Sequence, residues 1–127
     1  MKDIKDTVLL IVDDEILLRD ATATDFRRKG FQVLVAANGR EALEVMKTQV
    51  IDLVLTDVQM PNGDGVEFLK EVNTLGPQTP MVILISGFSD MTIEEAYTRG
   101  ASAVFPKPYY RKELLAAVLT ALSIDVS

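Results

Sequence analysis

Five short apolar segments recur along the chain, and they constrain its fold more than any other feature. They lie at 7–12, 31–37, 51–57, 81–86 and 102–105. Most lack an alternation of apolar and polar residues, which is typical of strands covered on both faces. Segments with helical character lie between and after them, at 15–29, 39–48, 65–75, 90–99 and 111–122. This regular alternation predicts an α/β fold with a doubly wound parallel sheet.

Local signals mark where several of these helices begin and end. Asn38 is suited to capping the helix that follows it, and Gly30 is suited to ending the first helix. In the first helix, spacing predicts an apolar stripe that faces the core. Its expected members are Leu17, Leu18, Ala21 and Phe26.

Composition excludes several classes of function. The 127 residues suit one domain, which we expect to span 1–127. Without cysteine or histidine, any metal must be hard and bound by oxygen. The net charge of −6 argues against direct nucleic-acid binding. No apolar run reaches the roughly 20 residues of a membrane span, and no signal peptide is recognisable, so we expect a cytoplasmic protein.

Polar residues follow the strands at one predicted edge of the sheet. Right-handed crossovers bring the carboxyl ends of parallel strands to the same rim, where ligands bind. Asp13 and Asp14 end the first strand, Asp57 the third, Ser86 the fourth and Lys107 the fifth. Clustered carboxylates need a cation, Mg²⁺ suits them, and a carboxylate can accept a phosphoryl group. The pattern predicts phosphoryl transfer onto an aspartate, assisted by Mg²⁺ and a lysine.

Four motifs in a fixed order extend this interpretation. They are VDD at 12–14, LTDVQMPNGDG at 55–65, ISG at 85–87 and GASAVFPKP at 100–108. Together they resemble the receiver domain of bacterial two-component response regulators over nearly the whole chain. The resemblance implies a flavodoxin-like, five-stranded parallel sheet of order 2-1-3-4-5 with five helices.

The resemblance also assigns a metal site. Asp57 matches the phospho-acceptor of the family, and Asp13 and Asp14 match the acidic pair that holds Mg²⁺ together with it. The backbone carbonyl of Gln59 matches a further ligand of the metal. Mn²⁺ is the expected substitute for Mg²⁺.

Three further positions are expected to respond to the phosphoryl group. Ser86 and Lys107 match the hydroxyl and the lysine that contact it, and the Lys107–Pro108 peptide bond is expected to be cis. Val104 stands where many receivers carry an aromatic switch residue. The neighbouring Phe105 does not replace that residue, because strand alternation directs it to the other face.

The family implies a signalling partner instead of a metabolic substrate. The phosphoryl donor is expected to be the phosphohistidine of a sensor histidine kinase or of a histidine phosphotransfer protein. The only catalysis expected is phosphorylation and slow dephosphorylation of the protein's own aspartate. An output domain or downstream protein is expected on the face formed by the fourth helix, fifth strand and fifth helix, and a phosphorylation-linked dimer is left open.

Other classes of function fit the sequence less well than a receiver domain does. An aspartate-nucleophile phosphohydrolase would carry a second aspartate two residues after the first, where this chain has Gln59. Dinucleotide binding is disfavoured, because no glycine turn follows the first strand. The remaining alternative is a receiver-like interaction module that works without phosphorylation, which the valine at position 104 keeps open.

Overall fold

A computed structural model describes residues 3–57, 65–72, 74, 80–86, 98, 101–106 and 109–122. The strands are β1 (Val8–Val12), β2 (Gln32–Ala36), β3 (Leu53–Asp57), β4 (Met81–Ser86) and β5 (Ala103–Pro106). The helices are α1 (Ile16–Lys29), α2 (Gly39–Thr48), α3 (Gly65–Val72) and α5 (Arg111–Ala121), with a short 3-10 helix, η1, at Ile4–Asp6. The helix expected at 90–99 lies almost entirely outside the described residues. No helix within those ranges is long and apolar enough to cross a bilayer.

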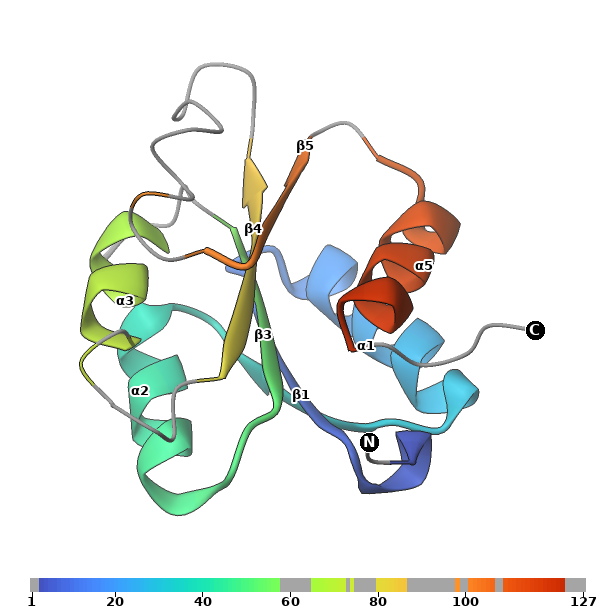
Figure 1. Ribbon diagram of the computed structural model, residues 1–127, viewed down its shortest axis with the longest axis horizontal. Helices are drawn as coiled ribbons and strands as arrows, with labels where there is room; N and C mark the ends of the chain where they lie inside the picture. The colour runs from blue at the N-terminus through green and yellow to red at the C-terminus, as the bar shows by residue number, and fades with distance from the viewer. Residues whose placement is uncertain are drawn as a thin grey trace.

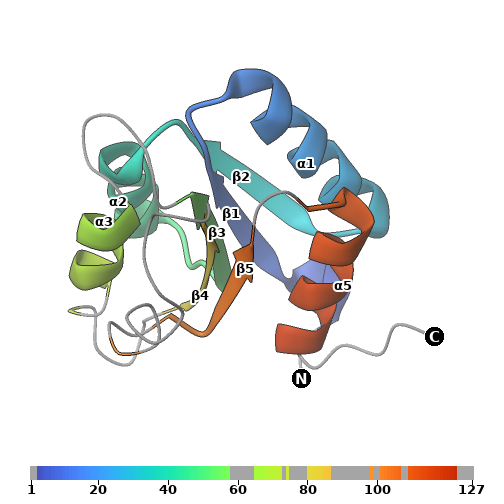
Figure 2. The ribbon, with the colours of Figure 1, turned by 90° about the horizontal axis from the view of Figure 1, so that it is seen from above.

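The strands form one parallel sheet whose order is β2-β1-β3-β4-β5. The predicted order and class of fold are therefore confirmed. Helices α2 and α3 cover one face of the sheet, and α1 and α5 cover the other (Figures 1 and 2). Every crossover thus returns the chain to the same end of the sheet, so the carboxyl ends of the strands share one rim.

Two apolar layers enclose the sheet, and strand alternation divides the residues between them. In β1, Leu10 and Val12 pack in the layer with Phe68 of α3, whereas Leu9 packs in the layer with Phe26 of α1. β3 is buried at every position. This explains why the central strands read as continuous apolar runs instead of alternating ones.

The predicted helix boundaries are explained by local contacts. Gly30 ends α1 with a left-handed φ of 115°, which favours glycine. Asn38 caps α2, because its side chain accepts a hydrogen bond of 2.9 Å from the Glu41 N–H. The Glu41 carboxylate accepts one of 3.0 Å from the Ala37 N–H, so a reciprocal pair of bonds fixes the turn between β2 and α2.

The predicted apolar stripe of α1 is partly wrong. Leu17 is 88% exposed, and the buried residues of the helix are Thr22, Ala23 and Phe26. Thr22 and Ala23 lie four and three positions before Phe26 and share its face. Leu17 lies nine positions before Phe26, roughly 180° away around the helix. Phe26 is the only predicted member of the stripe that is fully buried, while Leu18 and Ala21 are partly buried.

This correction can be tested with a pair of substitutions in α1. Phe26→Ala removes a ring that is 1% exposed and should lower the free energy of unfolding by about 3–5 kcal/mol. Leu17→Ala should change it by no more than about 0.5 kcal/mol, because the side chain is exposed. Urea unfolding followed by circular dichroism measures both, and similar losses for the two variants would contradict this orientation of α1.

Candidate functional site

Asp13 and Asp57 are brought together by the register of two neighbouring strands. β1 pairs with β3 from Leu9 opposite Leu53 to Val12 opposite Thr56. Asp13 directly follows β1 and Asp57 is the last residue of β3, and adjacent strands lie about 5 Å apart. The Asp13 N–H continues the sheet ladder by donating to the Ala36 carbonyl of β2 at 3.1 Å. The two carboxylates therefore lie side by side at the carboxyl-end rim.

Both of these carboxylates are largely removed from solvent. Asp13 is 8% exposed and Asp57 is 6% exposed, and Thr56 beside Asp57 is completely buried. Acidic side chains are rarely buried to this extent unless they are paired or coordinate a metal. The arrangement thus has the character of a binding site and not of a solvated turn.

The pKa of Asp13 is raised above its ordinary value. Burial is the main cause, because it disfavours the charged carboxylate. A hydrogen bond of 2.9 Å from the Glu15 N–H to Oδ1 opposes the shift in pKa. The negative charges of Asp57, Glu15 and Asp14 then raise this pKa further. A positive ligand at this rim would relieve both the repulsion and the burial of charge.

The other predicted site residues are placed only in part. Asp14 is exposed, and among the described residues no three acidic side chains form a group that could hold a metal. Ser86 ends β4 opposite Pro106, the last residue of β5, so its backbone lies at the same rim. Gln59 and the Lys107–Pro108 peptide bond lie outside the described residues.

Val104 and Phe105 point into different layers, as the strand alternation predicts. Val104 packs against the core layer of α2 and α3. Phe105 packs in the layer of α1 and α5, where its ring meets Tyr109 edge to face at 5.6 Å between centroids. Phe105 therefore cannot substitute for an aromatic side chain at position 104.

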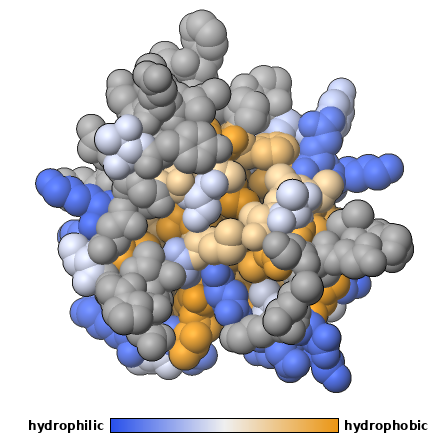
Figure 3. Space-filling view, in the orientation of Figure 1, coloured by the Kyte–Doolittle hydropathy of each residue, from blue (hydrophilic) through white to orange (hydrophobic). Residues whose placement is uncertain are grey.

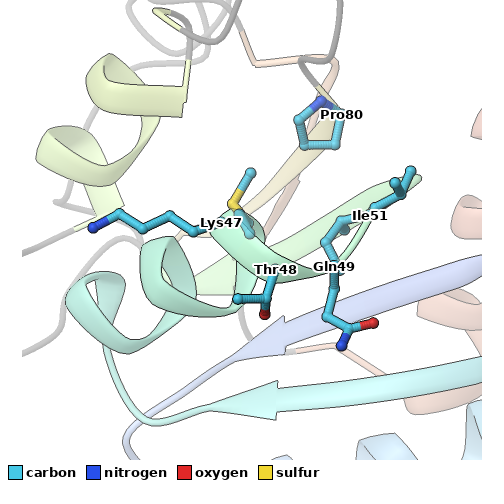
Figure 4. Close-up of a pocket in the computed structure, with 7 residues that line it drawn as sticks. Lys47, Thr48, Gln49, Ile51 and Pro80 are labelled. Carbon is cyan, nitrogen blue, oxygen red and sulfur yellow. The ribbon is translucent and has the colours of Figure 1, made fainter.

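A pocket of about 350 Å³ lies at the other end of the sheet. Residues at the end of α2 and before β3, together with Pro80 before β4, line it (Figure 4). The ammonium group of Lys47 extends away from Pro80, and none of the described residues that line the pocket is acidic. The pocket is therefore separate from the acidic rim.

One residue near the rim was missed by the sequence analysis. Arg19 of α1 places Nη1 3.4 Å from the carbonyl oxygen of Asp13, and its side chain is only 15% exposed. Its position offered a signal, because it precedes the buried residues Thr22, Ala23 and Phe26 by three, four and seven positions. A charged residue on the buried face of a helix is unusual enough to mark a local role.

The family of the chain is established by comparison with known proteins. Residues 9–119 match the model of the response regulator receiver domain. The chain therefore belongs to this family, and it is a receiver domain of the two-component signalling class. The resemblance that the four motifs indicated is confirmed.

Individual relatives agree with this assignment. Sporulation initiation phosphotransferase F of Bacillus subtilis is 36% identical over 111 residues, covering 87% of this chain and 89% of that protein. The transcriptional regulatory protein ZraR of Escherichia coli is 38% identical over 115 residues, covering 91% of this chain but 26% of ZraR. The chain spans between 23% and 34% of five curated relatives of this longer kind.

Solved receiver structures have the same fold. The Francisella response regulator 1452 receiver domain matches with a TM-score of 0.84 at 27% identity, covering 93% of this chain and 98% of that chain. The chemotaxis response regulator CheY4 of Vibrio cholerae matches with a TM-score of 0.80 at 28% identity, covering 91% and 98%. The fold therefore extends over nearly the full length of these single receiver domains.

The repulsion at the rim predicts that Asp13→Asn stabilises the metal-free protein. Asparagine keeps an oxygen that can accept from the Glu15 N–H, but it removes a buried charge. Because the pKa of Asp13 is raised in the folded state, ionisation destabilises the fold as the pH rises through that pKa. The variant should thus gain a few degrees in Tm at about pH 7 and less at about pH 4.

Thermal unfolding in a chelating buffer at several pH values measures this gain in Tm. Asp6→Asn is the matched control, because Asp6 is an exposed acid remote from the rim, and it should change Tm little at any pH. An Asp13→Asn variant with an equal or lower Tm than the wild type at neutral pH would contradict the predicted repulsion.

Proposed function

We propose that Asp57 is the phospho-acceptor of this receiver domain. The observation that carries the proposal is the pairing of two buried carboxylates, Asp57 and Asp13, at the carboxyl-end rim of a receiver fold. Such a pair is costly for stability, and functional sites are where proteins retain costly groups. The name of one relative, a phosphotransferase, supports a role in phosphoryl transfer.

The proposed step moves one phosphoryl group from a partner to this chain. A carboxylate oxygen of Asp57 attacks the phosphorus of a phosphohistidine, a P–O bond forms, the P–N bond breaks, and the imidazole leaves. The chain has no histidine, so the donor belongs to another protein or domain. Burial of Asp57 limits the approach of water, which favours slow hydrolysis of the acyl phosphate.

The residues at the rim fit a hard divalent cation. Mg²⁺ binds through one or two carboxylates and completes its shell with water and phosphate oxygens, so the pair Asp13 and Asp57 suits it, and Mn²⁺ can replace it. Asp14 and the carbonyl of Gln59 are proposed as the remaining contacts from the protein. When bound, the cation would neutralise charge on the phosphoryl oxygens. Asp13 would contribute a carboxylate that the Glu15 N–H already orients.

Ser86 and Lys107 are proposed to contact the phosphoryl group once it is on Asp57. The β4–β5 register supports this, because Ser86 lies opposite Pro106 and Lys107 follows directly in the chain. A lysine supplies a mobile point charge that can follow the phosphoryl oxygens. The Lys107–Pro108 bond is proposed to be cis, in line with the family.

The phosphodonor is proposed to be a histidine kinase or a histidine phosphotransfer protein. Ile16 is 60% exposed, Leu17 is 88% exposed, and both open α1 immediately after the acidic turn. Tyr110 before α5 is 75% exposed. Exposed apolar residues beside a buried reaction centre favour docking of another protein over that centre. The exposure of Leu17 supports a place in this proposed contact surface instead of the core.

The output surface is proposed to include β5 and α5 together with the segment 90–99. Figure 3 shows apolar side chains, with a few polar ones among them, in the middle of the face between α3 and α5. The transcriptional regulators among the relatives are longer than this chain, which supports an output carried by another domain or protein. A dimer linked to phosphorylation would use the same surface.

The remaining proposals concern the chain as a whole. Residues 1–127 are proposed to form a single receiver domain without direct nucleic-acid binding, because the net charge is −6. Its chemistry would be limited to phosphorylation and slow dephosphorylation of its own aspartate. Membership of the family supports a cytoplasmic location.

Switching in this chain is proposed to bypass position 104. Val104 is smaller than an aromatic ring and stiff at its side-chain torsion, so it cannot fill a ring-sized gap. We therefore expect the change of conformation to pass through residues 87–90 after β4. The alternative, a module that works without phosphorylation, predicts no change of conformation at all when the acceptor is modified.

The phospho-acceptor is tested by mass spectrometry after incubation with acetyl phosphate and Mg²⁺. The wild type should gain one phosphate, and Asp57→Asn should gain none, because the amide cannot form an acyl phosphate. Asp52→Asn is the matched control. Asp52 immediately precedes the first residue of β3, at the opposite end of the strand from Asp57, and accepts a hydrogen bond of 2.8 Å from the Val8 N–H. It should be labelled like the wild type. Equal labelling of Asp57→Asn would overturn the assignment.

Lys107→Ala should separate phosphorylation from switching. The variant should still be labelled at Asp57, but beryllofluoride, a phosphoryl mimic, should shift fewer of its amide resonances than in the wild type. Two-dimensional NMR of both proteins with and without the mimic measures this. A wild-type response in the variant would contradict the role of Lys107, and an unresponsive wild type would favour the phosphorylation-independent module.

A further inference from the structure

Arg19 combines a largely buried side chain with weak contacts. It lies in the second turn of α1, and its side chain is 15% exposed. Its Nε is buried and has no hydrogen-bond partner within the part of the chain that the structure describes. A guanidinium group held away from water in this way lowers stability unless it is compensated. Its retention on the buried face of α1 therefore needs a reason other than packing.

The ion pair of Arg19 does not supply that reason. Its Nε lies 3.7 Å from the Asp20 carboxylate, which is 62% exposed. Exposed pairs between adjacent residues contribute little, because water screens them. Arg19 and Asp20 are neighbours within α1, so their pairing also ties the helix to no other part of the fold.

The remaining contact of Arg19 connects α1 to the acidic turn. Its Nη1 points to the carbonyl oxygen of Asp13 at 3.4 Å, six residues earlier in the chain. The Asp13 N–H is already bound to Ala36 of β2, and the Asp13 carboxylate is bound by the Glu15 N–H. The guanidinium of Arg19 therefore contacts the backbone of Asp13 and not its side chain, so the Asp13 carboxylate stays available at the rim.

We propose that Arg19 is a positioning residue for the acidic turn at Asp13 and Asp14. Its guanidinium holds the Asp13 carbonyl and thereby fixes the direction in which the Asp13 carboxylate leaves the end of β1. This inference rests on the proposed function, because the orientation matters for a cation bound by Asp13 and Asp57. Residues that orient a metal ligand without touching the metal commonly matter in this way, and their removal weakens metal binding by about 10–100-fold.

The sign of the effect on Mg²⁺ affinity separates positioning from charge. If Arg19 acted only through its positive charge, its removal would make the rim more negative and tighten the binding of Mg²⁺. If it positions the Asp13 turn, its removal loosens that turn and weakens the binding. If it only stabilised the fold, Tm would fall and the Mg²⁺ dissociation constant would stay the same.

The experiment uses Arg19→Met, which keeps an unbranched apolar side chain but no donor. Isothermal titration with Mg²⁺ should show a dissociation constant raised about tenfold over the wild type. Arg19→Lys keeps a charge and a donor, and its dissociation constant should fall between the two. If Arg19→Met does not fold, Arg19→Lys alone tests the proposal, because charge is unchanged and any weakening reflects lost positioning.

A second measurement does not depend on metal. The Glu15 N–H donates to the Asp13 carboxylate, so its hydrogen exchange reports the order of the turn. In chelating buffer, exchange at Glu15 should be faster in Arg19→Met than in the wild type. A wild type that takes up neither Mg²⁺ nor phosphate would overturn the proposed function, whereas unchanged exchange at Glu15 would overturn the positioning role.

Arg27 provides a matched control on the same helix. Its Nη2 donates to the Val33 carbonyl of β2 at 3.0 Å, so it too ties α1 to a backbone oxygen, but away from the acidic turn. Arg27→Met should lower Tm while leaving the Mg²⁺ dissociation constant and the exchange at Glu15 unchanged. The proposal is overturned if Arg19→Met binds Mg²⁺ as tightly as or more tightly than the wild type, or if both variants weaken it equally.

Discussion

The register between β1 and β3 is the constraint on which the candidate site depends. Four consecutive residue pairs fix it, from Leu9 opposite Leu53 to Val12 opposite Thr56, and each of the last two residues is followed by an aspartate. A slip by one residue would exchange the two faces of a strand and separate Asp13 from Asp57. Burial of both strands holds the register, because each face packs against a different pair of helices. The packing of the core thus determines the distance between two carboxylates at its edge.

The same arrangement places stability and function in opposition. Burial and neighbouring negative charge raise the pKa of Asp13, so the metal-free site disfavours its own ionised form. The surrounding core tolerates this cost because the central strands behind the rim bury mainly apolar side chains on both faces. A bound cation would relieve this repulsion, because its positive charge would neutralise the negative charge that the fold concentrates at the rim.

The sequence predicted the sheet and the acidic rim well, because both depend on the order of elements along the chain. Short apolar runs reveal strands, and parallel order alone brings their last residues together. The rotation of α1 about its axis was harder, because apolar residues such as Leu17 occur on both of its faces. The contact between Arg19 and the Asp13 carbonyl depends on that rotation. The spacing of Arg19 from Phe26 therefore indicates a largely buried arginine only together with the orientation of the helix.

The alternation of β5 places its successive side chains in the two different layers of the fold. Val104 belongs to the layer of α2 and α3, and Phe105 with Tyr109 belongs to the layer of α1 and α5. With valine at 104, β5 presents no aromatic side chain to the first layer at that position. The second layer also contains α1, which carries Arg19. Asp25 of the same helix forms an ion pair of 3.3 Å with Arg111 of α5. The contacts that run from the acidic turn through α1 to α5 therefore lie in the layer that does not contain Val104.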